Sequence, residues 1–215
     1  MGFKNTSTMK KILIIDYKLG NHQSVANALD FLGYKFLISN SISDILRADA
    51  YILPGVGAFG EAMKNLTSLK IIDVLEQEVL KRNKPILGIC LGMQIMAEDS
   101  EENGNFKGLG WIKGHVVKMH PKKGNRIPHV GWNNIKVILK NPLFSRVTGD
   151  ANYYFDHSYH VICDKKNVAG IVLYGYKMTA AITNNNIFGI QFHPEKSQIN
   201  GLRLYKSFFN YCNIS

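Results

Sequence analysis

The sequence lacks the features of disulfide-stabilised, membrane-spanning and low-complexity proteins. Its 215 residues include only three cysteines, and their odd number and wide spacing argue against a disulfide framework or a zinc site. No apolar run reaches the ~18 residues that a membrane span requires. The first ten residues are polar, without the apolar stretch of a signal peptide. We therefore expect a cytoplasmic protein without metal, cofactor or membrane partner, with a flexible tail at residues 1–9 and one domain at 10–215.

Positive charge is in excess, with 26 Lys and Arg against 16 Asp and Glu and a net charge of +10. The densest basic stretch covers residues 113–126 (KGHVVKMHPKKGNR). No nucleic-acid-binding motif accompanies it, so we expect no nucleic-acid partner. We interpret the positive net charge as the composition of a lysine-rich, asparagine-rich proteome. The alternative is a basic surface that binds an acidic partner or a phosphorylated substrate.

The first half of the chain alternates between strand and helix patterns. Apolar runs at residues 11–16 (KILIID), 35–38, 51–53 and 85–89 predict buried strands, the third of them cut by Pro54 and Gly55. Helical spacing covers residues 21–31, with Gly33 as a stop, and about 58–81. This alternation predicts an open, mostly parallel α/β sheet with helices on both faces.

The second half has a different pattern. Short β segments with Gly and Asn between them run from residue 108 to 182 and predict an additional antiparallel portion. A last strand is expected at residues 187–192 (IFGIQF), followed by HPEKS and a helix at about 201–211.

The candidate nucleophile is Cys90, in the segment Gly88-Ile89-Cys90-Leu91-Gly92. A reactive residue framed by small residues between a strand and a helix is typical of a nucleophile elbow. Glycines tolerate the crowded turn, and a helix that starts near Leu91 would favour the thiolate over the thiol. A buried, inert cysteine is the alternative, and we assign no role to Cys163 or Cys212.

Among seven histidines, His193 is the best placed to serve as the base that a cysteine nucleophile needs. It stands at the carboxyl end of the predicted last strand, as Cys90 does on its own strand, and such ends form the ligand crevice of parallel sheets. Glu195 follows two residues later. In an extended segment it would face the same side and hold the imidazole in its productive tautomer.

Residues 55–60 (GVGAFG) match G-x-G-x-x-G between a strand and a helix, which is a dinucleotide-binding context. The motif follows a later strand rather than the first, however, and no acidic residue stands at a strand end ~20 residues beyond it. Because Cys90 is a candidate nucleophile, we interpret residues 55–60 instead as a turn whose backbone N–H groups face a developing oxyanion. A non-catalytic nucleotide-binding or scaffold protein remains an alternative.

The combination of PGVGAFG (54–60), GICLGMQ (88–94) and HPEKS (193–197) resembles the class-I glutamine amidotransferase family. Residues 16–21 (DYKLGN), 131–133 (GWN) and 154–159 (YFDHSY) are similar, more narrowly, to the glutaminase subunits of imidazole glycerol phosphate synthases of histidine biosynthesis. The resemblance implies a glutaminase that hydrolyses L-glutamine to glutamate and ammonia. It also implies a heterodimer with a cyclase subunit, a barrel that receives the ammonia and forms imidazole glycerol phosphate and an aminoimidazole carboxamide ribotide.

The resemblance also assigns roles to individual residues. It implies a catalytic triad of Cys90, His193 and Glu195, and oxyanion donors at Gly55 or Val56 and at Leu91. The remaining assignments are a glutamine pocket of Gln94, Glu102, His157, Ser158 and Tyr159, and a cyclase-contact surface of Asn21, Trp132, Tyr154 and Lys196.

Several residues depart from the family pattern without touching the triad. Lys18 and Leu19 stand where Gly-Met is usual, and Asp156 stands where Val is usual. His160 and the segment 174–176 (YGY) resemble a paralogous group that supplies ammonia to amidotransferases of bacterial surface-sugar synthesis. The identity of the partner is therefore open between these two pathways.

Overall fold

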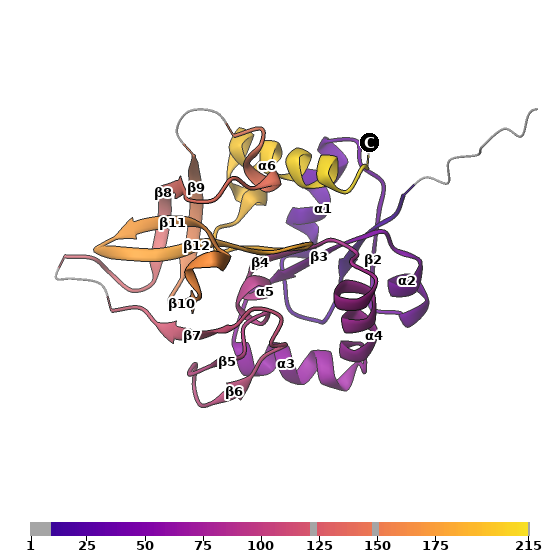
Figure 1. Cartoon of the computed structure of the whole chain (residues 1–215), viewed down its shortest axis with the longest axis horizontal. Helices are drawn as coiled ribbons and strands as arrows, with labels where there is room; N and C mark the ends of the chain where they lie inside the picture. The colour runs from indigo at the N-terminus through magenta and orange to yellow at the C-terminus, as the bar shows by residue number, and fades with distance from the viewer. Residues whose placement is uncertain (1–9, 121–123, 148–150, 215) are drawn as a thin grey trace, which may run out of the picture.

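The computed structural model describes residues 10–120, 124–147 and 151–214. The expected flexible tail at residues 1–9 lies outside this part of the chain. Figure 1 shows the arrangement of the elements. In chain order they are β1 (Ile12–Ile15), α1 (His22–Phe31), β2 (Phe36–Ser39), α2 (Ile42–Arg47), β3 (Ala50–Gly55), α3 (Phe59–Ser68), α4 (Ile72–Glu76) with a π-helical turn (Gln77–Lys81), β4 (Ile86–Cys90), α5 (Leu91–Gln94), β5 (Asp99–Ser100), β6 (Phe106–Lys107), β7 (Gly114–Lys118), β8 (His129–Val137), a 3₁₀ turn (Pro142–Phe144), β9 (Asn152–His157), β10 (Tyr159–Cys163), a 3₁₀ turn (Lys165–Asn167), β11 (Val168–Tyr174), β12 (Tyr176–Asn184), β13 (Ile187–Ile190), a 3₁₀ turn (Pro194–Lys196) and α6 (Gln198–Tyr211).

One nine-stranded sheet runs through both halves of the chain, in the order β2-β1-β3-β4-β13-β12-β11-β8-β9. The pairs from β2 to β13 are parallel. From β13 onward each pair is antiparallel. The prediction of a mostly parallel α/β sheet with an additional antiparallel portion is confirmed, and the antiparallel portion continues the same sheet.

Helices cover both faces of the parallel part because its strands are apolar on both sides. Ile12 and Ile14 of β1 pack in a cluster with residues of α1 and α6. Their neighbours Leu13 and Ile15 face the opposite way, into a cluster with α2, α3 and α4. Figure 1 shows α1 and α6 on one side of the sheet and α3 and α4 on the other.

Helix α1 begins and ends as the sequence predicts. The Asn21 side chain accepts a hydrogen bond from the Ser24 N–H at 3.2 Å and caps the first turn. Gly33 has a φ of +80°, the left-handed conformation with which helices commonly end. The start of α1 is thereby fixed next to the carboxyl end of β1.

Three sequence-based boundaries are wrong, and two elements were not predicted. Strand β3 continues through Pro54 to Gly55, where it pairs with β4. On its other side, β1 pairs with β3 only as far as Ile52, so the backbone N–H that Pro54 lacks is not needed there. Strand β13 ends at Ile190, two residues earlier than expected, and α6 begins three residues earlier, at Gln198. Helix α2 and the short β5–β6 hairpin were not predicted.

A second, four-stranded sheet has the order β10-β7-β5-β6. Strand β10 follows β9 after the single residue Ser158, so the two sheets meet where His157 and Tyr159 lie. Among the helices of the described part, none is long and apolar enough to cross a membrane.

Candidate active site

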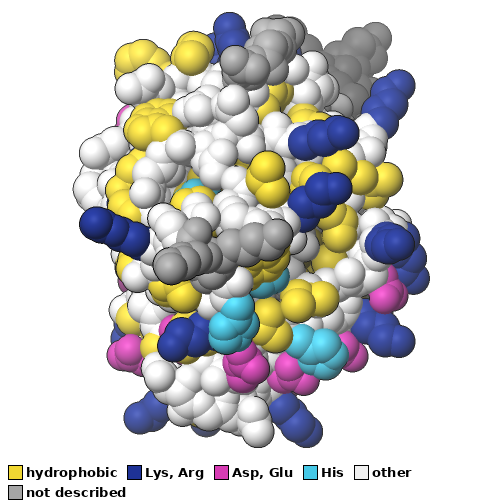
Figure 2. All heavy atoms as spheres, turned by 90° about the vertical axis from the view of Figure 1, so that its left-hand side faces the viewer, with side chains coloured by type: hydrophobic (Ala, Val, Ile, Leu, Met, Phe, Trp, Pro, Cys, Tyr) yellow, Lys and Arg dark blue, Asp and Glu magenta, His cyan; other side chains and the backbone are white. Residues whose placement is uncertain are grey.

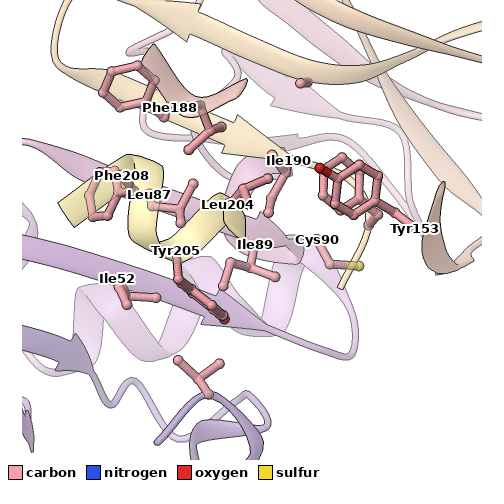
Figure 3. Packing of buried hydrophobic residues seen from close by; sticks show 14 of the residues in the cluster. Ile52, Leu87, Ile89, Cys90, Tyr153, Phe188, Ile190, Leu204, Tyr205 and Phe208 are labelled. Atoms are coloured by element: carbon pink, nitrogen blue, oxygen red, sulfur yellow. The ribbon is translucent and has the colours of Figure 1, made fainter. Parts of the chain in front are cut away.

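Cys90 lies at a sharp corner between β4 and α5. It is the last residue of the strand, and its φ of +54° is rare for a residue with a side chain. A Cβ on Gly92 would lie 2.8 Å from the carbonyl carbon of Leu53, and one on Gly88 would lie 2.7 Å from the oxygen of Gly92. The small residues around Cys90 are therefore required by close backbone packing. In Figure 3 the sulfur of Cys90 points away from the packed cluster, at the end of its strand.

Helix α5 is a single turn of four residues. The backbone dipole of so short a helix is weak. The environment of the sulfur depends more on individual side chains than on the helix.

His193 lies three residues beyond the end of β13. It is held by an isolated β-bridge to Tyr154 of β9, in which the His193 N–H donates to the Tyr154 carbonyl at 2.8 Å. Ser197 supports the same junction, because its hydroxyl donates to the His193 carbonyl at 2.6 Å and accepts from the Tyr154 N–H at 3.0 Å. His193 is thus anchored to the antiparallel part of the sheet.

Glu195 holds the imidazole of His193. The distance between His193 Nδ1 and Glu195 Oε1 is 2.8 Å, and both side chains are buried. A carboxylate accepts, so Nδ1 carries a hydrogen, and Nε2 is the ring nitrogen left for Cys90. The contact was predicted from an extended segment, but residues 194–196 form a 3₁₀ turn, which brings the two side chains together in a different way.

The electrostatic environment favours a charged His193. Burial by itself lowers the pKa of the imidazole, but hydrogen bonds to Cys90 and Glu195, and the negative charges of these groups, outweigh it and raise the pKa to about 10. A charged imidazole at this position is the kind of partner that activates a cysteine nucleophile.

A cavity of about 300 Å³ opens above Cys90 and His193. Of the residues expected in the glutamine pocket, all five line it: Gln94, Glu102, His157, Ser158 and Tyr159. Asp156, Pro128 and Lys196 complete part of the wall. The sequence did not predict Asp156 and Pro128 as pocket residues.

Two of the expected pocket residues are already engaged within the protein. Gln94 donates both hydrogens of its amide, to the Tyr159 carbonyl at 3.0 Å and to Gln191 Oε1 at 3.1 Å. Glu102 Oε2 accepts from the Phe59 N–H at 2.8 Å, at the start of α3. For Gln94, the side-chain oxygen is the group left to face a substrate.

His157 and His129 form a buried, neutral pair. Burial lowers the pKa of His157 to about 3 and that of His129 to about 4. His157 Nδ1 lies 2.9 Å from the Tyr159 carbonyl, and its Nε2 lies 3.1 Å from His129 Nδ1. Because the carbonyl can only accept, His157 carries its hydrogen on Nδ1, and His129 donates to His157.

The expected oxyanion donors lie at the carboxyl ends of β3 and β4. Gly55 pairs with Cys90 in the sheet, and Val56 and Leu91 line the cavity together with Gly57. Gly57 has a φ of +104°. The G-x-G-x-x-G segment thus forms part of the wall beside the sulfur.

Three of the four residues expected at a partner surface lie together. The rings of Trp132 and Tyr154 meet edge to face with 6.1 Å between centroids, and Lys196 Nζ lies 5.3 Å from the Tyr154 ring centroid. Trp132 is 45% exposed. Asn21 lies instead at the start of α1, where it caps the helix.

Sequence reasoning missed Gln191, whose Nε2 lies 3.5 Å from the sulfur of Cys90. A signal was present, since Gln191 is the one polar residue in the apolar run IFGIQF. Tyr17 was also missed. Tyr17 is buried, and its hydroxyl has no hydrogen-bond partner among the described residues. Its pKa is raised mainly by burial and to a smaller extent by the nearby charge of Cys90.

The described residues contain no group of three or more His, Cys, Asp or Glu side chains placed to hold a metal ion. Figure 2 shows the end of the molecule that carries the antiparallel strands. On this face the Lys and Arg side chains are scattered among neutral and apolar surface.

The family model and the similar curated proteins agree on one family. The family described as glutamine amidotransferase class-I matches residues 13–210. The imidazole glycerol phosphate synthase subunit HisH 2 of Vibrio vulnificus is 49% identical over 205 residues, covering 95% of this chain and 96% of the relative. The subunit HisH 1 of Campylobacter jejuni strain 81-176 is 45% identical over 197 residues, covering 92% and 98%.

Solved structures share the fold at low identity. A structure titled glutamine amidotransferase superposes with a TM-score of 0.74 at 17% identity, covering 94% of this chain and 99% of that one. PurLQS from Thermotoga maritima superposes with a TM-score of 0.71 at 20% identity, covering 95% and 99%.

Proposed function

The chain belongs to the class-I glutamine amidotransferase family, and from this membership we propose that it is the glutaminase subunit of an imidazole glycerol phosphate synthase. Support for this pathway comes from relatives at 45–49% identity that carry the subunit name. One observation carries the glutaminase chemistry: Cys90 and His193 line a single cavity, and Glu195 holds the ring of His193 from the other side.

The proposed mechanism begins with the thiolate of Cys90 adding to the carboxamide carbon of glutamine. Backbone N–H groups of Leu91 and of Gly55 or Val56 stabilise the oxyanion, a contribution typically worth ~3 to 4 kcal/mol per donor. The imidazolium of His193 gives its proton to the leaving nitrogen, and ammonia departs. A γ-glutamyl thioester on Cys90 and a neutral His193 remain.

The second half-reaction restores the enzyme. His193 takes a proton from water, the resulting hydroxide attacks the thioester carbon, and the thiolate of Cys90 leaves. Glutamate is released, and Glu195 stabilises the imidazolium that forms again. Gln94, Glu102, His157, Ser158 and Tyr159 form the glutamine pocket in this proposal.

A cyclase subunit is the proposed partner in a heterodimer, and it uses the ammonia to form imidazole glycerol phosphate and the carboxamide ribotide. Asn21, Trp132, Tyr154 and Lys196 are the proposed contact residues. We further propose that residues 10–215 act as one glutamine amidotransferase domain, supported by the continuous nine-stranded sheet, and that the enzyme works in the cytoplasm.

The test combines this protein with a purified cyclase subunit. Glutamate release from glutamine is measured for the protein alone, for the complex, and for a complex that contains Cys90→Ser. We expect turnover in the complex and its loss in the variant. A complex that releases no glutamate, or a Cys90→Ser variant with full activity, would contradict the proposal.

A second candidate is a glutaminase for a surface-sugar amidotransferase. One observation favours it: the sequence features that suggest this group lie in contact, with the Tyr176 hydroxyl 3.2 Å from His160 Nε2 and the Tyr174 ring stacked on His129. Gene neighbourhood separates the two, since histidine genes support the first candidate and surface-polysaccharide genes the second.

A further inference from the structure

A backbone carbonyl orders the polar groups beneath the cavity. The oxygen of Tyr159 is 2.9 Å from His157 Nδ1 and 3.0 Å from the amide nitrogen of Gln94. A carbonyl has no hydrogen to donate, so both neighbours must present N–H groups to it. This fixes the orientation of the Gln94 amide without reference to any substrate.

The orientation of Gln94 in turn fixes that of Gln191. The second hydrogen of the Gln94 amide points at Gln191 Oε1 at 3.1 Å, in a fully buried position. With its oxygen facing Gln94, Gln191 must direct its own NH₂ group the other way. That group faces the sulfur of Cys90 at 3.5 Å.

We propose that Gln191 is a further catalytic residue, whose buried side-chain N–H donates to the sulfur of Cys90 and stabilises the thiolate for attack on glutamine. This inference rests on the proposed function for its substrate. The hydrogen bond itself is independent of the reaction.

The hydrogen-bond partners around the sulfur of Cys90 suit the thiolate better than the thiol. A thiol can donate its hydrogen to the Asp156 carbonyl, but that distance is 3.9 Å, which is long even for sulfur. A thiolate can accept from both Gln191 and His193. Hydrogen bonds to a charged acceptor are stronger than those to a neutral one, so the arrangement favours the charged sulfur.

Gln191 is held rigidly enough to act in this way. Its side chain is completely buried, and its backbone N–H donates to the Ala180 carbonyl of β12 at 2.9 Å. The donor therefore loses little freedom when the thiolate forms, and water does not compete for it.

The test uses two variants of similar size. Gln191→Met removes the polar amide. Gln191→Glu keeps an oxygen for Gln94 but replaces the donor with a carboxylate beside the sulfur. A matched control is Asn167→Ala, which removes a buried amide whose Nδ2 donates to the Thr183 carbonyl at 2.9 Å, with no contact to Cys90 among its described hydrogen bonds.

The primary measurement is the rate of Cys90 alkylation by iodoacetamide as a function of pH, read by mass spectrometry, with Cys90→Ser defining the background. In Gln191→Met we expect the pH of half-maximal rate to rise by about one unit, the shift expected for a lost hydrogen bond to a charged group. The shift in Gln191→Glu should be larger. In the complex, kcat should fall about tenfold while KM for glutamine changes less than about threefold.

Profiles of the two Gln191 variants that superpose on that of the wild type would overturn the proposal. If both variants fail to fold, the wild-type protein still provides a test: the side-chain amide resonances of Gln191 must shift when Cys90 is alkylated, and unchanged resonances would also overturn it. Altered alkylation without any glutaminase activity would support this hydrogen bond and contradict the proposed function. Glutaminase activity with unaltered alkylation would do the reverse.

Discussion

Gly201 is remote from the cavity, but we expect its replacement by alanine to impair catalysis. Gly201 lies in the first turns of α6 and packs against the turn that carries Glu195. A Cβ on Gly201 would lie 2.6 Å from the carbonyl carbon of Pro194 and 3.0 Å from its Cα, and closer still to its oxygen. These are backbone atoms, so no rotation of a flexible side chain relieves the overlap.

The size of the effect follows from the position of Pro194 between His193 and Glu195. Relief of the overlap requires the 194–196 turn and α6 to separate by about 1 Å, and a displacement of that size at reacting groups costs on the order of 10²-fold in rate. Overpacking of this kind also costs about 1 to 3 kcal/mol of stability. Helix propensity alone predicts the opposite sign, a gain of about 1 kcal/mol for Gly to Ala.

The assay compares kcat for glutamine hydrolysis in the partner complex with the thermal midpoint of the free subunit. Gly170→Ala is the control, since a Cβ there meets its nearest neighbour, the Ala181 side chain, at an ordinary 3.5 Å. We expect Gly201→Ala to lower both quantities and Gly170→Ala to change neither appreciably. A Gly201→Ala protein with a raised thermal midpoint and normal kcat would refute the packing argument.

Three other predictions concern the triad, the buried histidines and the docking surface. Glu195→Gln should lower kcat by about 10² to 10⁴-fold with little change in thermal midpoint, because His193 loses the carboxylate that fixes its tautomer; unchanged kcat would contradict this. The pKa of His157 is about 3 in the folded protein and 6.5 in the unfolded chain, so between these pH values the unfolded chain binds one more proton. The free energy of unfolding should therefore fall by up to about 1.4 kcal/mol per pH unit as the pH drops below 6.5. Urea titrations of wild type and His157→Gln at several pH values check this, and equal pH dependences of the two proteins would exclude it. Trp132→Ala should weaken cyclase binding about 30-fold in calorimetry while Leu37→Ala, on the opposite edge strand, should not; equal affinities would remove Trp132 from the interface.

The sequence predicts those parts of the fold that depend on local patterns. Continuous apolar runs identify β1 and β4, and the cap at Asn21 with a stop at Gly33 defines α1. Strand boundaries that depend on the pairing of neighbouring strands could not be predicted from the sequence. Pro54 lies within β3 because β1 ends alongside Ile52, and only the assembled sheet contains that information.

The candidate site divides in the same way. Residues carried by short motifs were identified from the chain: Cys90 and His193 line one cavity, and Glu195 contacts His193. Gln191 and His129 act through partners 97 and 28 residues away, so their contacts exist only after folding. The 3₁₀ turn at 194–196 also shows that a correct contact can be predicted from an incorrect local geometry.

Tyr154 joins the proposed docking surface to the catalytic base through a single peptide unit. Its ring faces outward toward Trp132 and Lys196, and its carbonyl receives the N–H of His193. A protein that contacts this ring would act on the same residue that holds the backbone of His193. If the proposed partner docks there, the hydrogen bond between Tyr154 and His193 would connect the docking surface directly to the backbone of the proposed base.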